Sequence, residues 1–162
     1  MDTMIADPEG WPEPTILEVG PGVTTAVLRH EGVTLEDLPM LFDADYQRVE
    51  AVTVALEIPI TGPAVAVYEG DPQGEFTVEI GFPVAVSFPA TDEVTSSTMP
   101  GGRVAALTHH GAYDTLPEGW ARLMEAAPGM RPGGRYAEIY VTEPSPEVDP
   151  ATLRTDLVVE LA

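Results

Sequence analysis

The sequence predicts an α+β fold built from a strand–helix–strand–strand unit that occurs twice. We expect the two copies to be related by a pseudo-twofold axis, with antiparallel strands, two main helices and a central cleft. Three observations predict this. PGVTTAVLRHEG (residues 21–32) aligns with PGGRVAALTHHG (residues 100–111) in Pro-Gly, His and Gly. A helical pattern follows each segment, and two more strand-like segments follow each helical pattern.

Each aligned segment is expected to be a strand, because a β-branched or alanine-rich run is opened by Pro-Gly and closed by Gly. A threonine then precedes an acid by three positions, in Thr34 with Asp37 and in Thr115 with Glu118, which is the capping-box pattern of a helix start. Apolar residues recur at helical spacing after each threonine. They are Leu38, Leu41, Phe42, Val49 and Val52 in the first copy, and Leu116, Trp120, Leu123, Met124 and Ala127 in the second.

The remaining strands are expected at AVAVY (64–68), FTVEIGFPVAV (76–86), YAEIYV (136–141) and RTDLVVEL (154–161). The link at 89–98 is polar and is expected to be exposed. One helix on one face leaves the other face of a unit uncovered, so the two copies should pair to form a core. We therefore predict a single domain over residues 1–162, with repeat one at about 14–88 and repeat two at about 94–162. The seam between the copies is the expected pocket.

Charge is the strongest global feature of the chain. Twenty-seven acids face seven bases, all of them arginine, for a net charge of −20. Because such a surface repels phosphate, direct nucleic-acid binding is not expected. Adaptation to high salt or arginine-rich coding, a preference for cationic ligands, and mimicry of DNA towards a protein partner all remain open explanations.

Location is predicted from what the sequence lacks. No apolar run approaches the ~18 residues of a membrane span. The start MDTMIADPEGWPEP is acidic and resembles neither a secretory signal nor a transit peptide. With no cysteine there is no disulfide framework. We expect a cytoplasmic protein that does not contact membranes.

The stretch RYAEIYVTEP (135–144) contains the most informative residue, Glu138. Alternate side chains of a strand share a face, so Tyr136, Glu138 and Tyr140 should point one way. Ala137 and its neighbours should point the other way and pack under a helix. Aromatic rings around a carboxylate attract an organic cation. The alternative is that Glu138 is exposed to solvent or paired with an arginine such as Arg103.

Four phrases, in this order and spacing, carry a resemblance to a known family: PAVAVYEGDPQGEFTVEIGFPVA, PGGRVAALTHHGAYDTLPEGWARLMEA, YAEIYVTEP and DPATLRTDLVVEL. From about residue 14 to 161 the chain resembles the GyrI-like, or AraC-type effector-binding, small-molecule-binding domains. The resemblance implies the duplicated fold and a cleft for bulky, often cationic or aromatic, molecules. It makes Glu138 the key acid of the cleft, with Tyr113, Trp120 and Tyr68 directed at the ligand.

The chain departs from the family at Ala137, where many relatives have tryptophan or another large aromatic residue. Neighbouring Tyr136 is expected to substitute for that ring in part. Some relatives are ligand sensors of transcription regulators. Only about a dozen residues precede the first strand here, so we expect no helix-turn-helix in this chain.

Several candidate residues have a purely structural interpretation. Trp120 on an amphipathic helix could belong to the core, and Tyr113 could pack the strand-to-helix turn. Phe42 and Tyr46 are expected in the core, with one of them facing the cleft. His109 and His110 are adjacent on a strand, face opposite ways and have no third ligand at a recognisable spacing, so no metal site is expected. No phosphate loop or dinucleotide motif appears, and no cofactor is expected.

Three functions follow from these observations. The first is a freestanding protein that binds lipophilic, cationic or aromatic small molecules, as a sensor or by sequestration. The second, implied by relatives, is a hydrolase of strained, cyclopropane-type electrophiles, with Glu138 as general base and Tyr140 or Tyr113 polarising the leaving oxygen. The third is an acidic protein-interaction partner of DNA gyrase or of a regulator.

Overall fold

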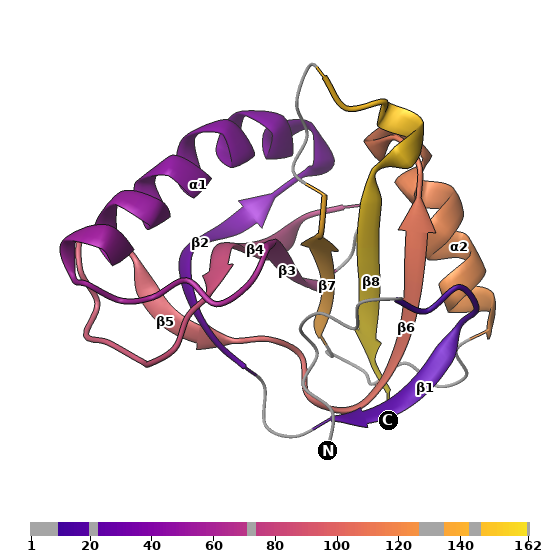
Figure 1. The fold of residues 1–162 in the computed structure, drawn as a ribbon, viewed down its shortest axis with the longest axis horizontal. Helices are drawn as coiled ribbons and strands as arrows, with labels where there is room; N and C mark the ends of the chain where they lie inside the picture. The colour runs from indigo at the N-terminus through magenta and orange to yellow at the C-terminus, as the bar shows by residue number, and fades with distance from the viewer. Residues whose placement is uncertain (1–9, 20–22, 71–73, 127–134, 143–146, 162) are drawn as a thin grey trace.

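The computed structural model describes residues 10–19, 23–70, 74–126, 135–142 and 147–161. Eight strands form one antiparallel sheet in the order β1-β6-β8-β7-β3-β4-β2-β5 (Figure 1). The strands are β1 (Thr15–Val19), β2 (Thr24–Val33), β3 (Ala64–Gly70), β4 (Phe76–Pro83), β5 (Thr95–Thr98), β6 (Gly102–His110), β7 (Arg135–Tyr140) and β8 (Arg154–Glu160). The helices are α1 (Leu38–Ala55) and α2 (Leu116–Ala126), with short 3-10 turns η1 (Leu35–Asp37), η2 (Tyr113–Thr115) and η3 (Pro150–Thr152).

The predicted α+β class is confirmed, and the two predicted units lie side by side in the sheet. The first unit contributes β3-β4-β2 and the second contributes β7-β8-β6, so each has the same connection of strands. The units meet where β3 pairs with β7, with Ala66 opposite Glu138 and Tyr68 opposite Tyr136. Duplication, the pseudo-twofold axis and the division into repeats within one domain stay predictions.

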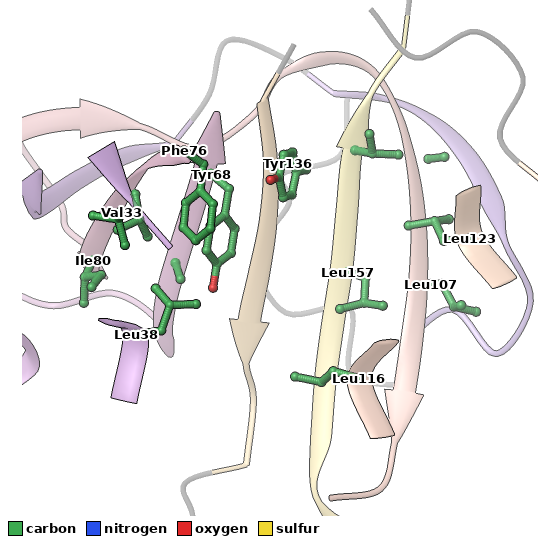
Figure 2. Close-up of a cluster of buried hydrophobic side chains, with 14 of the residues drawn as sticks. Val33, Leu38, Tyr68, Phe76, Ile80, Leu107, Leu116, Leu123, Tyr136 and Leu157 are labelled. Atoms are coloured by element: carbon green, nitrogen blue, oxygen red, sulfur yellow. The ribbon is translucent and has the colours of Figure 1, made fainter. Parts of the chain in front are cut away.

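Both helices cover the same face of the sheet. Leu38 of α1 and Leu116 and Leu123 of α2 are buried in one cluster with strand residues from both units. Figure 2 shows this cluster, with Tyr68 and Tyr136 on neighbouring strands between the two helices. This face is called the helix face below. Neither described helix is long and apolar enough to cross a membrane.

No helix among the described residues lies on the opposite face. Ala137 and Ile139 of β7 pack there with Trp11 and Met99. The prediction that Ala137 and its neighbours lie under a helix is therefore wrong. Both helices lie instead over the other face of β7, which carries Tyr136 and Glu138.

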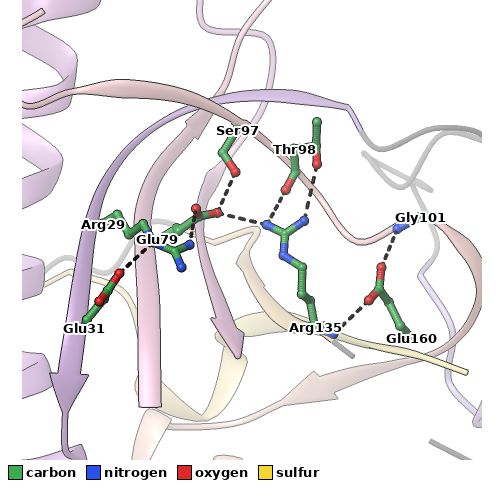
Figure 3. A network of polar contacts seen from close by, with 8 residues as sticks. All are labelled: Arg29, Glu31, Glu79, Ser97, Thr98, Gly101, Arg135 and Glu160. Carbon is green, nitrogen blue, oxygen red and sulfur yellow. Dashed lines mark hydrogen bonds and ion pairs between the residues drawn. The ribbon is translucent and has the colours of Figure 1, made fainter. Parts of the chain in front are cut away.

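A polar network ties the strands together on this opposite face (Figure 3). Glu79 of β4 accepts hydrogen bonds from Arg29 at 3.0 Å, from Ser97 at 2.7 Å and from Arg135 at 2.9 Å. The glutamate is 7% exposed. Because a buried carboxylate needs partners, these contacts hold β2, β5 and β7 to β4.

The two helix starts differ from one another. The predicted capping box of Thr34 and Asp37 is confirmed, since Asp37 Oδ2 accepts from the backbone N–H of Thr34 at 3.0 Å. The box predicted at Thr115 is wrong. Its hydroxyl donates to the carbonyl of Ala112 at 2.6 Å and lies 2.8 Å from Nε2 of His109, so the side chain fastens the turn to β6.

The link at 89–98 is exposed at residues 89, 90, 92, 93 and 98, as predicted, but the rest of it differs from the prediction. It contains the edge strand β5, which pairs with β2, and Val94 is completely buried. A short run of threonine and serine carries little hydrophobic periodicity, so the pattern did not indicate a strand. Ala127 and the first Pro-Gly turn, at 21–22, lie outside the described residues.

Candidate functional site

Glu138 lies in the middle of the helix face. Its neighbours across the sheet are Leu157 on β8 and Ala66 on β3. Because alanine ends at Cβ, the side chain of Glu138 has room on the β3 side. The residue is nevertheless 8% exposed, so the alternative of a solvent-exposed acid is wrong.

Three neutral donors surround the carboxylate. Oε1 accepts from the hydroxyl of Tyr68 at 2.9 Å and from the hydroxyl of Tyr140 at 2.6 Å. Oε2 accepts from Nε1 of Trp120 at 2.8 Å. Three neutral donors therefore hold the carboxyl group of Glu138 in one orientation.

No ion pair of Glu138 occurs among the described residues. The alternative of pairing with an arginine is therefore wrong for this part of the chain. A buried carboxylate bonded only to uncharged groups has no opposite charge beside it, and attraction between charges is stronger in a region of low dielectric constant. Such a charge favours a cation that enters the same region.

The tyrosines around Glu138 hold their protons. Burial raises the pKa of Tyr68 and of Tyr140 well above the usual value, and the charge of Glu138 raises both further. Burial and Glu138 likewise raise the pKa of Tyr113. Both bonded phenols are therefore protonated near neutral pH and remain hydrogen-bond donors to the carboxylate.

Aromatic rings form two groups around this acid. Tyr68 stacks on Tyr136 with ring centroids 5.3 Å apart, and Trp120 meets the ring of Tyr136 edge-on at 5.6 Å. Tyr113 contacts Tyr140 at 5.7 Å. These six residues, Glu138 with the five rings, are the ones proposed from the sequence. The structure brings all of them together.

Exposure differs across this aromatic set. Tyr68 and Tyr136 are buried, Trp120 and Tyr140 are half-buried, and Tyr113 is 37% exposed. The set therefore has an inner end at β3 and an outer end at η2. A molecule arriving from solvent meets Tyr113 first.

Two further rings from α1 reach the same region. Phe42 contacts Tyr140 at 6.0 Å, and Tyr46 stacks on Phe42 at 5.8 Å. Burial, followed by the charge of Glu138, raises the pKa of Tyr46 well above its usual value. Helical spacing placed both rings on the inward side of the helix. No sequence signal showed that they would lie near Glu138, because the pairing of β3 with β7 determines that proximity.

Comparison with known proteins identifies the family of the chain. The family model of the GyrI-like small molecule binding domain matches residues 12–162. The chain belongs to this GyrI-like family. No curated protein matches the chain.

The fold of this GyrI-like domain is shared by several solved structures. The EcmrR C-terminal domain has a TM-score of 0.72 at 14% identity, over 92% of this chain and 98% of that one. A hydrolase from Listeria innocua has a TM-score of 0.66 at 12% identity, over 94% and 93%. SAV2435, solved bound to tetraphenylphosphonium, has a TM-score of 0.64 at 9% identity, over 93% and 94%. At these identities the likeness shows the fold alone.

His30 and His109 of this GyrI-like domain have separate partners. His109 lies on the helix face and is bonded to Thr115, and burial lowers its pKa. Nε2 of His30 lies 2.5 Å from Oδ2 of Asp45, a buried residue of α1. Within the described ranges, no three His, Cys, Asp or Glu residues are grouped to hold a metal ion.

Proposed function

We propose that this domain binds bulky organic cations, with Glu138 as the anionic anchor and the aromatic rings around it as the walls. A single observation carries the proposal. Glu138 is 8% exposed and accepts three hydrogen bonds from neutral groups, without an ion pair in the part of the chain that the structure describes.

The energetics favour a cation over a neutral molecule of the same shape. A ring contributes about 0.5–2 kcal/mol to cation binding, with the larger values at desolvated sites. A carboxylate that is already oriented loses little side-chain entropy when the ligand arrives. The family description and the tetraphenylphosphonium bound to SAV2435 support this class of ligand.

The ligand is proposed to enter from the exposed end of the aromatic set. Tyr113, Trp120 and Tyr140 retain exposure there, whereas Tyr68 and Tyr136 are buried. Entry requires movement of these partly exposed rings towards solvent. We assign the protein a cytoplasmic role as a sensor or as a sequestering protein for lipophilic compounds.

The experiment compares two ions of the same shape and opposite charge, tetraphenylphosphonium and tetraphenylborate. Calorimetric titration of the wild-type protein should show binding of the cation and much weaker binding of the anion. In Glu138→Gln the Kd for the cation should rise at least tenfold. Glu118→Gln is the matched control, because it removes the same charge from an exposed position on α2 and should change the Kd less than twofold.

Equal binding of the two ions by the wild-type protein would contradict the proposal. So would undiminished cation binding in Glu138→Gln. Circular dichroism of both variants establishes that the fold is kept. The Glu118→Gln control separates the local effect of Glu138 from the general attraction exerted by a net charge of −20.

Hydrolysis of strained electrophiles is the second candidate, favoured by the likeness in fold to the Listeria innocua hydrolase. The geometry favours binding. Three donors already occupy about three of the four lone-pair positions of Glu138, whereas a general base must take a proton from water at a free position. Turnover of a cyclopropane-type substrate that disappears in Glu138→Ala would establish catalysis.

The interaction with DNA gyrase or a regulator stays a separate prediction, and it depends on surface charge rather than on Glu138. A pull-down with purified gyrase at moderate ionic strength tests it. Capture that is equal in wild type and Glu138→Gln supports it, and absence of capture removes it.

A further inference from the structure

The sheet has an open edge along the second half of β2. On the side away from β4, strand β5 pairs with β2 only at Thr24 to Val27. No other described strand takes its place beyond Val27. The strand itself continues to Val33 and stays paired with β4 on its other side.

The backbone direction at this edge follows from two hydrogen bonds. The carbonyl of Thr24 accepts from Val84 on the β4 side, and the carbonyl of Val23 accepts from Met99 on the β5 side, each at 2.9 Å. Backbone groups of an antiparallel strand alternate between its two neighbours. The backbone N–H and C=O groups of Thr25 and Val27 therefore point towards β5. Those of Arg29 point the same way, to the place where β5 has ended.

A hollow of about 390 Å³ lies beside this edge, between the end of β2 and the start of α1. Its apolar lining is Val33, Met40 and Leu41. Met40 is 75% exposed, and Leu35 on the adjoining turn is 54% exposed. An exposed hollow that is lined by apolar and charged side chains and lies next to unpaired backbone groups is an arrangement that can bind an extended peptide.

The rim of the hollow is acidic. Glu31 and Asp37 line it, and the side chain of Glu31 is 76% exposed. Arg29, which also lines it, is shared between two acids, with Nη1 3.0 Å from Glu79 and Nε 3.6 Å from the exposed Glu31, so the rim carries more acid than base. With a net charge of −20 over the whole chain, this edge complements a positively charged partner.

We propose that the open edge of β2 binds a short extended segment of a partner protein that carries lysine or arginine. The segment adds a strand beside Arg29, places an apolar side chain between Met40 and Val33, and brings its basic side chains to Glu31 and Asp37. Main-chain hydrogen bonds supply affinity, and the alternating side chains supply specificity.

A short segment fits better than a second copy of this chain. The pairing of β2 with β4 shifts between His30 and Val33, which is a bulge that bends the strand and keeps any added ladder short. Two copies would also bring together two chains that each carry a net charge of −20. Repulsion between them opposes a continuous sheet.

The test titrates the full-length, ¹⁵N-labelled protein with the peptide acetyl-KVKVKV-amide. Amide shifts should concentrate in residues 28–33 and 36–41, and exchange of the Arg29 amide should slow at least tenfold. Glu31→Lys and Met40→Asp should each raise the Kd at least tenfold. Glu125→Lys and Val54→Asp, at exposed sites on α2 and at the other end of α1, should change it less than twofold.

Two control peptides test separately whether binding requires positive charge and whether it requires strand pairing. Acetyl-EVEVEV-amide has the wrong charge, and a version of the basic peptide that is N-methylated at every residue cannot donate backbone hydrogen bonds from either edge. Either one binding as tightly as the basic peptide overturns the proposal, as do shifts spread over the surface. Loss of peptide binding in Glu138→Gln would show that the peptide binds at Glu138, and this result would also overturn the proposal.

Sedimentation velocity without peptide tests the second-copy alternative. The expected result is a monomer in both wild type and Met40→Asp. If the wild-type protein is a dimer and Met40→Asp is a monomer, the proposal is overturned, because the edge of β2 would then bind a second copy of the chain.

Discussion

Tyr68 and Tyr140 donate to the same oxygen, Oε1 of Glu138, from two different halves of the sequence. The relationship follows from strand pairing. Ala66 and Glu138 are opposite one another, and each tyrosine lies two residues beyond its member of that pair. Because β3 and β7 are antiparallel, the tyrosines approach the carboxylate from opposite directions along the sheet.

Removing the hydroxyl groups of Tyr68 and Tyr140 together should lower the free energy of unfolding by more than the sum of the two single losses. Tyr68→Phe and Tyr140→Phe each remove one hydrogen bond to a charged group, which is worth about 1.5–3 kcal/mol. In the double variant Oε1 has no donor, so the loss should exceed the sum of the single losses by about 0.5 kcal/mol or more. Urea denaturation measures all three free energies of unfolding. Tyr113→Phe is the control, since its hydroxyl makes no described bond to Glu138, and strict additivity would show that the two donors act independently.

The free energy of unfolding should fall as the pH rises above about 10. The pKa values of Tyr68 and Tyr140 are raised in the folded state, so these phenols lose protons in the unfolded chain first. Stability is therefore intact below the unfolded value and is lost from there up to the raised folded value, by about 1.4 kcal/mol per pH unit for each phenol. Urea denaturation from pH 8 to 11 checks this. The slope should be shallower in Tyr68→Phe, and an unchanged slope would contradict the assignment.

Gly119→Ala should weaken cation binding although it lies outside the aromatic set. A Cβ at this position would lie 2.8 Å from Nδ1 of His109 and 3.1 Å from Cδ1 of Leu157, so either the His109 ring or α2 must shift, and we expect α2 to move away from the sheet. Trp120 is the next residue and would lose its alignment with Glu138. We expect at least a threefold higher Kd for tetraphenylphosphonium despite a gain of about 1 kcal/mol in helix propensity. Titration calorimetry measures the Kd, with Glu125→Ala on the exposed side of α2 as the unaffected control.

Glu79→Gln should loosen the edge of the sheet and leave the cation site unchanged. The carboxylate binds Arg29, Arg135 and Ser97 on the face opposite Glu138. Without its charge two arginines lose their common partner, and we expect a loss of about 1–3 kcal/mol. Hydrogen exchange should accelerate in β5 before it does in β7, which lies inside the sheet. Uniform acceleration across all strands would show that the network has no local role.

Much of the fold could be predicted because its patterns are local. Residues at helical spacing, such as Leu38, Val49 and Leu123, are buried in the helices where they were expected. The predicted strands correspond to β2, β3, β4, β6, β7 and β8, because apolar β-branched runs bounded by glycine and proline are distinctive. The face shared by Tyr136, Glu138 and Tyr140 followed from alternation alone.

The parts that were missed depend on contacts between distant residues. Which face of β7 the helices cover is decided by where α1 and α2 dock, and the strand pattern is compatible with either face. The hydroxyl of Thr115 matched a capping signal, yet His109 and Ala112 compete for it. The convergence of Tyr68, Tyr140 and Trp120 on Glu138 depends on the β3–β7 register, which no segment of the sequence encodes by itself.

The chain contains two tryptophans, and the sheet separates them. The indole N–H of Trp120 is bonded to Glu138, whereas Trp11 is 9% exposed in the cluster on the far side. Fluorescence emission from Trp120 should therefore change when a ligand binds at Glu138. Emission from Trp11 should stay unchanged and serves as an internal reference. The protein carries its own optical reporter, and Trp11→Phe would isolate the responding signal without an added dye.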